Sequence, residues 1–388
     1  MYVLLIVLFV INAFIIVWAM VGYPLSLRVI DKYNRKPSII KTRTHEPTVT
    51  LMIVAHNEEK VILNKLKNVT GLNYPKEKLE ILVSSDHSTD QTNEIVRAFI
   101  KEHKDFNIRL YEVKERKGKT NAQNEAALTA KSDILVMTDA NAMLDKEAVK
   151  ELVSAFASDD IAYVTGRLKY VNAEAEWTSE SESSYWEWDL KMREIESKLH
   201  SVTAGNGALY ACRTKDYYQF DPIKCHDGAM PKHYVLEGKR AIYNKDAIAY
   251  EKAGATVEDE FGRKVRMSRS IFTALFSNLQ LYNFFKHKWF SYCYFGHRFC
   301  RQNLWSAHLM VLLLNIPLAF FHFFFQLTLL FQVIFYSVAL VKHIAKINNR
   351  IPNMIYYYSI TVLAQMLGVF RQITGKSKPF WEKAESTR

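Results

Sequence analysis

The stretch TVTLMIVAHNEE at residues 48–59 decides the fold class. Residues 48–54 are an apolar run rich in β-branched side chains, which predicts a buried strand, and the polar loop AHNEE and a helical pattern over about 58–68 come next. The same order returns downstream, with predicted strands at 79–84, 107–111 and 133–137 and predicted helices at 91–102 and 119–130. Strands that alternate with crossover helices indicate an α/β fold with a mostly parallel sheet and helices on both faces.

Polar loops follow these strands and crossover elements: AHNEE, then SDHSTD at 85–90, KGKT at 117–120 and TDAN at 138–141. In such sheets ligands bind beyond the carboxyl ends of the strands. One polar loop usually caps the next helix, as we expect of Asp90, but four at one edge predict a polar ligand. The loops supply Glu58, Asp86, Lys117, Lys119, Asp139 and Asn141. Carboxylates beside lysines suit a nucleotide diphosphate with a divalent cation, and neither a GxGxxG fingerprint nor a P-loop is present.

Apolar residues are concentrated at the two ends of this chain of 388 residues. Residues 1–22 carry no charge and are long enough to cross a membrane. Because no basic region precedes them and no cleavage site comes after them, we predict an uncleaved anchor rather than a signal peptide. The basic run over 28–43 places the chain from about residue 24 onward in the cytoplasm. Residues 304–341 predict two further spans with a break near 315–325, and 351–370 is a block that spans, re-enters or lies along the interface.

Residues 265–300 mix aromatic and basic side chains without an uncharged run of spanning length. This pattern is typical of interfacial helices on a membrane surface, with an amphipathic core helix as the alternative. The net charge is +11, from 51 Lys+Arg and 40 Asp+Glu. No nucleic-acid-binding pattern accompanies it, so we expect anionic lipid and no nucleic acid as its partner. The four cysteines form no CxxC pair or Cys/His cluster, which predicts free thiols.

These motifs resemble the membrane-anchored family 2 glycosyltransferases, inverting enzymes of the GT-A fold that include chitin, cellulose and hyaluronan synthases. Within that family the TDAN loop is similar to bacterial exopolysaccharide-type enzymes. The resemblance runs from residue 47 to the C-terminus and includes the N-terminal anchor. It implies a transmembrane helix at 1–22, a cytoplasmic GT-A domain at 47–262, interfacial amphipathic helices at 263–303, a transmembrane region at 304–371 and a tail at 372–388.

The resemblance implies a site for a nucleotide sugar, UDP-linked in enzymes of this type. The family's A-x-N-E-E loop, here 55–59, implies that the uridine is held by Ala55, Asn57 and Glu58. Its S-D-G-S-T-D loop, here 85–90, implies that Asp86 accepts from the uracil N–H, while His87 replaces the usual glycine, which puts the shape of this loop in question. The motif GKTNAQN at 118–124 brings Lys119 to the base or the phosphates.

The D-x-D-like site of the family is Asp139-Ala140-Asn141 here. It implies Mg²⁺ or Mn²⁺ held by Asp139 and Asn141 and completed by diphosphate oxygens. The family places its general base in an acidic pair before a helix, and the matching stretch is CHDGAMP at 225–231. Asp227 keeps the base position and would deprotonate the acceptor hydroxyl, with a helix cap as the alternative. His226 replaces the first acid and would raise or lower the pKa of the base according to its own charge.

The segment AGNGA at 204–208 matches the family's glycine-rich acceptor side, which implies acceptor contacts from Gly205, Asn206 and Gly207. The family's Q-x-x-R-W motif aligns with 263–267 and implies that Arg263 and Arg266 meet the diphosphate. A basic stripe facing anionic lipid is the alternative for these arginines. Met267 replaces the tryptophan that stacks under the acceptor in long-chain synthases, which weakens the expectation of processive growth.

Three functions stay open from the sequence. The first is a multi-pass membrane glycosyltransferase that extends a polysaccharide or a lipid-linked saccharide at the cytoplasmic face of the cell membrane. The second is a single transfer to a polyprenyl-phosphate carrier. The third is a silent scaffold or sugar-nucleotide sensor, motivated by the departures at Asn141, His226 and Met267. Three or four spans form a small bundle, so a polymer product predicts an oligomer or a separate export partner.

Overall fold

The structure is a computed structural model that describes residues 1–34, 41–42, 44–171, 177–252 and 256–379, without the side chains of 177–186. The chain divides into two compact units. Unit 1 comprises Met1–Asn34, Glu174–Tyr185 and Gly254–Ser377, and unit 2 comprises Arg35–Ala173, Trp186–Ala253 and Lys378–Arg388. Part of the basic run over 28–43 and the end of the predicted tail at 372–388 lie outside the described residues.

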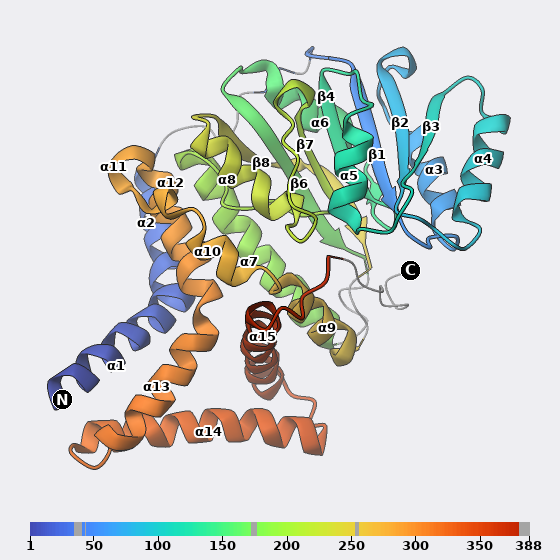
Figure 1. Cartoon of the computed structure of the whole chain (residues 1–388). Coiled ribbons are helices and arrows are strands. Elements are labelled where there is room, and N and C mark those ends of the chain that lie inside the picture. Colours follow the sequence, from blue (N-terminus) through green and yellow to red (C-terminus); the bar gives the residue numbers. More distant parts are fainter. Residues whose placement is uncertain (35–40, 43, 172–176, 253–255, 380–388) are drawn as a thin grey trace. The chain divides into compact units, whose positions relative to one another are not determined.

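Unit 2 is built on an eight-stranded sheet in the order β3-β2-β1-β4-β7-β6-β8-β5 (Figure 1). The strands are β1 (Val49–Ala55), β2 (Leu79–Ser85), β3 (Asn107–Glu112), β4 (Ile134–Asp139), β5 (Met143–Leu144), β6 (Ile161–Tyr170), β7 (Leu209–Arg213) and β8 (Arg240–Glu251). Neighbours from β3 to β4 are parallel, as are β6 and β8. Strand β7 runs antiparallel to β4 and β6, and β5 runs antiparallel to β8. The predicted strands and the mostly parallel sheet are confirmed.

Helices cover both faces of this sheet, as predicted (Figure 1). They are α3 (Ile62–Thr70), α4 (Thr92–Glu102), α5 (Lys119–Ala127), α6 (Ala148–Ser154) and α8 (His226–Leu236), with short 3₁₀ turns at Lys76–Lys78, Ala155–Ala157 and Thr214–Asp216. Helix α7 (Trp177–Leu199) belongs partly to each unit.

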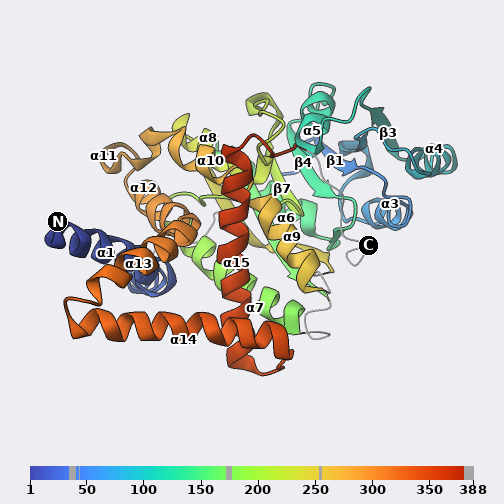
Figure 2. The same ribbon diagram turned by 60° about the horizontal axis from the view of Figure 1, so that its bottom comes forward.

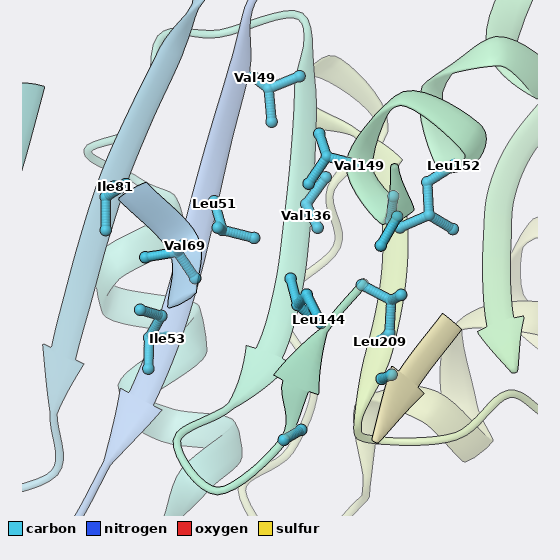
Figure 3. Packing of buried hydrophobic residues seen from close by; sticks show 14 of the residues in the cluster. Val49, Leu51, Ile53, Val69, Ile81, Val136, Leu144, Val149, Leu152 and Leu209 are labelled. Carbon is cyan, nitrogen blue, oxygen red and sulfur yellow. The ribbon is translucent and has the colours of Figure 1, made fainter. Parts of the chain in front are cut away.

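The alternation of side chains along β1 explains the two layers of core. Leu51 and Ile53 pack with residues of α3 and α6 in one buried cluster (Figure 3). Met52 and Val54 belong to a second cluster with residues of α5 and α8. Because both faces of the strand are buried, its sequence is an almost continuous apolar run. The sheet is thereby held rigidly beneath the loops at its carboxyl edge.

Unit 1 is helical in the residues that the structure describes. It contains α1 (Tyr2–Val17), the π-helical turn η1 (Trp18–Gly22), α2 (Tyr23–Tyr33), α9 (Val257–Met267), α10 (Ile271–Phe276), the 3₁₀ turn η5 (Leu279–Tyr282), α11 (Phe284–His287), α12 (Trp289–Cys293), the π-helical turn η6 (Tyr294–Cys300), α13 (Leu304–Leu318), α14 (Phe323–Ala345) and α15 (Arg350–Ile373). Figure 2 shows α15 alongside α9. His308 of α13 is hydrogen-bonded to the hydroxyls of Tyr336 on α14 (2.9 Å) and Tyr358 on α15 (2.7 Å), so one side chain ties three helices.

Among the described residues, two helices are long and apolar enough to cross a membrane by length and composition. They are Tyr2–Tyr33, which extends the predicted anchor at 1–22, and Phe323–Ala345. The helix Leu304–Leu318 is apolar but has only 15 residues, and the break after it lies inside the predicted range 315–325. Of the three or four predicted spans, two thus coincide with helices of spanning length and composition among the described residues.

The aromatic residues of 265–300 divide between the interior and the surface of unit 1. Phe290 and Tyr294 are buried, whereas Phe272, Phe285 and Trp289 are exposed. The exposed rings are what an interfacial segment predicts, and the buried ones are what a core helix predicts. This segment therefore combines both expectations. All four cysteines lie among the described residues, and none of them forms a disulfide, as predicted.

Candidate functional site

The predicted loops begin at one edge of the sheet. Ala55 at the end of β1 lies opposite Ser85 in β2, and Val54 lies opposite Asp139 in β4, so the three strands end at the same level. The side chain of Ala55 is buried in the core, and its carbonyl accepts a hydrogen bond from the amide of Asp86 (2.8 Å). Any contact of Ala55 with a ligand would therefore come from its backbone.

The first loop is fastened to the second by Asn57. Its side-chain oxygen accepts from the backbone amide of Thr89 (2.8 Å), and the backbone amide of Asn57 donates to the hydroxyl of Ser88 (3.2 Å). Asn57 and His87 have φ values of +52° and +54°. His87 therefore keeps the left-handed backbone that a glycine in this place permits, at a conformational cost of about 1–2 kcal/mol.

The side chain of Asp86 connects the second loop to the third. It is buried, and one of its oxygens accepts from the amides of Lys117 and Gly118 (3.3 Å each). Burial raises the pKa of Asp86, and these two hydrogen bonds oppose the rise. Asp90 accepts from the amide of Thr92, the first residue of α4 (3.0 Å), and from the amide of Glu59 (3.1 Å), while Gln91 occupies the N-cap position of the helix.

Lys119 lies at the centre of the candidate site. It is the first residue of α5, and its ammonium group pairs with the carboxylate of Asp139 at the end of β4. Burial alone would lower the pKa of Lys119, but the charges of Asp139 and Asp227 outweigh it and raise the pKa. For Asp227, burial raises the pKa most, Lys119 opposes this rise and Asp139 adds to it. The three predicted residues thus act on one another electrostatically.

His226, which replaces the first acid of the family's pair, contacts neutral side chains. Its Nε2 atom lies 3.3 Å from the side-chain oxygen of Asn124 and 3.3 Å from the hydroxyl of Tyr217. Burial and then the charge of Lys119 lower the pKa of His226 to about 3. His226 is therefore neutral at physiological pH and contributes no charge to the base.

The glycine-rich segment lies against the same cluster. A Cβ atom on Gly207 would come within 3.2 Å of the ammonium nitrogen of Lys119 and 3.5 Å of a carboxylate oxygen of Asp139. The side chain of Asn206 is buried and folds the segment itself. It donates to the carbonyl of Gly166 (2.6 Å) and accepts from the amides of Ala208 (3.1 Å) and Leu209 (3.2 Å). Contacts of this segment with an acceptor would therefore come from its backbone.

Gly205 cannot be enlarged without moving its neighbours. A Cβ atom there would lie 1.9 Å from the hydroxyl oxygen of Tyr163. We expect Gly205→Ala to lower the free energy of unfolding by about 1–3 kcal/mol, as overpacking does, and Tyr163→Phe in the same chain to restore part of it. Melting temperatures of the two single variants and the double variant check this. Gly228→Ala is the control, because nothing lies within 4 Å of its Cβ position, and an equal loss there would contradict the explanation.

Sequence reasoning missed Lys65, which is fully buried on α3 beneath the TDAN loop. Its ammonium group donates to the hydroxyl of Thr138 (2.9 Å) and to the carbonyl of Ala142, and Thr138 in turn donates to the carbonyl of Ala208 (2.7 Å). Lys65 therefore supports both the TDAN loop and the glycine-rich segment. The signal was present in the sequence, since Lys65 shares a helical face with Ile62, Leu66 and Val69.

Burial lowers the pKa of Lys65 from 10.5 to about 7. Between these values the unfolded chain binds the proton more tightly, so the contribution of Lys65 to stability rises with pH from about 7 to 10. At about 1.4 kcal/mol per pH unit the full effect is at most about 5 kcal/mol. We expect the Lys65→Met variant to lose this rise in melting temperature between pH 7 and pH 9.5. Lys67→Met, at an exposed position of the same helix, should keep it.

The residues at Asp139 and Asn141 fit a divalent cation only as part of a shared site. One carboxylate and one amide provide two hard oxygen ligands, and within the described ranges no group of three His, Cys, Asp or Glu could hold a metal ion. A cation there would take its other ligands from a diphosphate. The remaining predicted residues, Arg263 and Arg266, lie on α9 in unit 1, where Arg263 binds both carboxylate oxygens of Glu260 (2.7 and 2.9 Å).

Comparison with known proteins identifies the class of this domain. Residues 50–219 match the family described as Glycosyl transferase family 2. The chain therefore contains a family 2 glycosyltransferase domain over these residues, which include Lys119 and Asp139, whereas Asp227 on α8 lies beyond the matched range.

Three relatives illustrate the match. A probable glycosyltransferase YdaM of Bacillus subtilis is 38% identical over 131 residues, which cover 33% of this chain and 31% of the relative. A poly-beta-1,6-N-acetyl-D-glucosamine synthase of Staphylococcus aureus is 32% identical over 140 residues, covering 36% and 32%. A beta-monoglucosyldiacylglycerol synthase of Nostoc is 25% identical over 163 residues, covering 42% and 35%. The matches thus span about a third of the length of these relatives.

Among solved structures, a mannosyltransferase of Pyrobaculum calidifontis in complex with GDP-Man and Mn²⁺ has the same fold. The TM-score is 0.73 at 20% sequence identity, and the alignment covers 95% of this chain and 99% of the other. This likeness confirms the predicted GT-A-type fold.

Proposed function

We propose that this protein is an inverting glycosyltransferase that moves a sugar from a nucleotide sugar, UDP-linked, to a glycan or lipid-linked acceptor. The observation that carries the proposal is the cluster of Lys119, Asp139 and Asp227 at the carboxyl edge of the sheet. It combines a cation for a diphosphate, a ligand for a metal and a carboxylate for a base. A scaffold would not need all three beside one another.

The donor is proposed to lie across the first three loops, with the uracil against Asp86 and the uridine along Asn57 and Glu58. Lys119 is proposed to meet the diphosphate, and for Arg263 and Arg266 a role toward the diphosphate stays a prediction from the family motif. Asp139 and Asn141 would hold Mg²⁺ or Mn²⁺, which supplies charge neutralisation of the leaving diphosphate when bound. The mannosyltransferase of the same fold is in complex with GDP-Man and Mn²⁺, which makes GDP-linked sugars the first competitor to test.

The chemical step needs one base. Asp227 takes the proton of the acceptor hydroxyl, whose oxygen forms a bond to the anomeric carbon of the donor. The bond from that carbon to the diphosphate oxygen breaks on the opposite face, and the electron pair leaves with the nucleotide diphosphate. Lys119 compensates the negative charge that develops on this leaving group. The configuration of the anomeric carbon is inverted by this single displacement.

The location is proposed to be a membrane, with unit 2 on the cytoplasmic face. Two helices long enough to span and the exposed aromatic side chains of unit 1 support this. The names of two relatives differ in product, a glycolipid in Nostoc and a polysaccharide in Staphylococcus aureus. The test therefore includes an acceptor for each of the two product classes and a polyprenyl-phosphate acceptor.

The experiment uses the full chain in nanodiscs with a panel of UDP- and GDP-sugars and either Mg²⁺ or Mn²⁺. We expect release of one nucleotide diphosphate that depends on an added acceptor or lipid. Mass spectrometry of the product then separates a polymer from a single addition, and NMR of the anomeric proton shows the configuration. Absence of turnover with every donor would overturn the proposal, and retention of configuration would overturn the single displacement.

A further inference from the structure

We propose that Arg193, held by Asp189, is a positioning residue for Asp227 and acts through the backbone of Ala204 and Gly205. The inference rests on the proposed function and deepens it, because it states what keeps the base in place. Neither residue belongs to a motif of the loops at the sheet edge. Both lie one helical turn apart on α7 and are almost completely buried.

A continuous chain of contacts joins Arg193 to the base. The guanidinium group donates from Nη1 to the carbonyls of Ala204 (2.9 Å) and Gly205 (2.6 Å), and from Nε to the carboxylate of Asp189. The amide of Gly205 donates to the backbone carbonyl of Asp227 (2.8 Å). Gly205 thus receives Arg193 on its carbonyl and holds Asp227 by its amide, so a displacement of the guanidinium moves the base residue.

The other side of the segment is closed by Tyr163. Its hydroxyl lies only 1.9 Å from the position that a Cβ atom of residue 205 would occupy. The backbone of Gly205 is therefore fixed between Tyr163 and the guanidinium of Arg193. The rigid planar fork of the arginine donates to the two carbonyls and to the carboxylate in fixed directions, whereas the ammonium group of a lysine is a point charge on a flexible stem. The fixed backbone of Gly205 also sets the position of Gly207 in the same segment. Gly207 lies close to the ammonium group of Lys119.

A contribution to folding stability does not by itself explain the buried ion pair of Arg193 and Asp189. Replacing a buried ion pair by apolar residues of similar volume is often neutral or stabilising, because charges lose their hydration when they are buried. The positive charge of Arg193 also acts on Asp227. Lys119 and Arg193 favour the ionised form of Asp227, whereas Asp139 opposes it. Tyr163 and Tyr210, the titratable groups of β6 and β7 that also interact with Asp227, stay neutral because burial raises the pKa of each. Arg193 therefore both places Asp227 and supports its charge.

The test compares two arginines that bind backbone carbonyls at opposite edges of the sheet. Arg213, at the far end of β7, donates to the carbonyls of Ile161 (2.9 Å), Phe156 (2.8 Å) and Ser158 (2.8 Å). Full-chain variants Arg193→Gln, Arg193→Lys and Arg213→Gln are prepared in nanodiscs. Melting temperature, the Kd for UDP with Mn²⁺ and the kcat and KM for donor turnover are measured for each.

We expect Arg193→Gln to lower kcat by about 100-fold, the effect of a misplaced reacting group, with the donor KM and the Kd for UDP unchanged. Arg193→Lys should recover part of kcat because it keeps the charge, and Arg213→Gln should lower only the melting temperature. A kcat of Arg193→Gln that equals that of Arg213→Gln would overturn the inference while leaving the proposed function intact. A wild-type protein without turnover would overturn both. If Arg193→Gln fails to fold, Asp189→Asn provides the same comparison, and an unchanged kcat there would equally overturn the inference.

Discussion

The Asp227→Asn variant is expected to lose sugar transfer by about 10²- to 10⁴-fold, the usual contribution of a general base. The amide has the same shape as the carboxylate but cannot accept the proton of the acceptor hydroxyl. Because Asp227 is not proposed to bind the nucleotide, the Kd for UDP should remain close to that of the wild-type protein. Initial rates of nucleotide release and calorimetry with UDP measure the two quantities.

A matched control is available on the same stretch of chain. Asp221 is exposed, and its carboxylate accepts a local hydrogen bond from the amide of Ile223 (3.1 Å). Asp221→Asn should therefore leave transfer unchanged. Nucleotide release at the wild-type rate in Asp227→Asn would exclude Asp227 as the base. The alternative prediction, a helix cap, is not what the structure shows, because Cys225 is the N-cap of α8 and Asp227 lies within its first turn.

The pH dependence of transfer tests the same residue in the wild-type protein. The base must be deprotonated to act, so the rate rises with pH through the pKa of Asp227. Burial raises this pKa above the ordinary value of 3.8, and Asp139 adds to the rise, whereas Lys119 opposes it. The acidic limb of kcat/KM is therefore expected above pH 3.8. A limb that is identical in wild-type protein and Asp227→Asn would assign it to another group.

The parallel half of the sheet could be predicted from the sequence because three of its strands, β1, β2 and β4, are almost fully buried. Strands such as β1 and β4 are nearly continuous apolar runs, and each is followed by a polar loop. The second half could not be placed in this way. Strand β6 ends in partly exposed polar residues, and β7 runs antiparallel to both of its neighbours, which the repeated order of strand, polar loop and helix does not predict.

The residues of the candidate site were predictable where a short motif places them directly after a strand, as with Asp86 and Asp139. Their supports were not. Arg193 acts on backbone carbonyls that any sequence possesses, so no motif announces it. Asn206 is predicted to contact the acceptor, but the motif does not show that its buried side chain also donates to the carbonyl of Gly166 in β6 and accepts from the amide of Ala208, because a buried amide must satisfy its hydrogen bonds. Roles that depend on which partner a side chain reaches need the three-dimensional structure.

The Asp139→Asn variant is expected to lose transfer by at least about 100-fold and to weaken the binding of UDP in the presence of Mn²⁺. The substitution removes one of two proposed metal ligands and leaves Lys119 without the carboxylate to which it is paired. The positive charge of Lys119 then acts on Asp227 without competition from Asp139, which lowers the pKa of the base and makes it a weaker proton acceptor. The variant therefore damages both halves of the reaction.

Calorimetry of UDP with and without Mn²⁺ separates these effects, since the loss of a metal ligand matters only when Mn²⁺ is present. Asp133→Asn is the control, because Asp133 precedes the same strand at its opposite end and accepts from Thr48 (3.0 Å from the amide). A double-mutant cycle with Lys119→Met should give a coupling of about 0.5–3 kcal/mol between Lys119 and Asp139 in UDP binding, as expected for residues in contact. If Asp139→Asn bound UDP and Mn²⁺ like the wild-type protein, the metal would have to be held elsewhere, and the charge of Lys119 alone would remain to stabilise the leaving diphosphate.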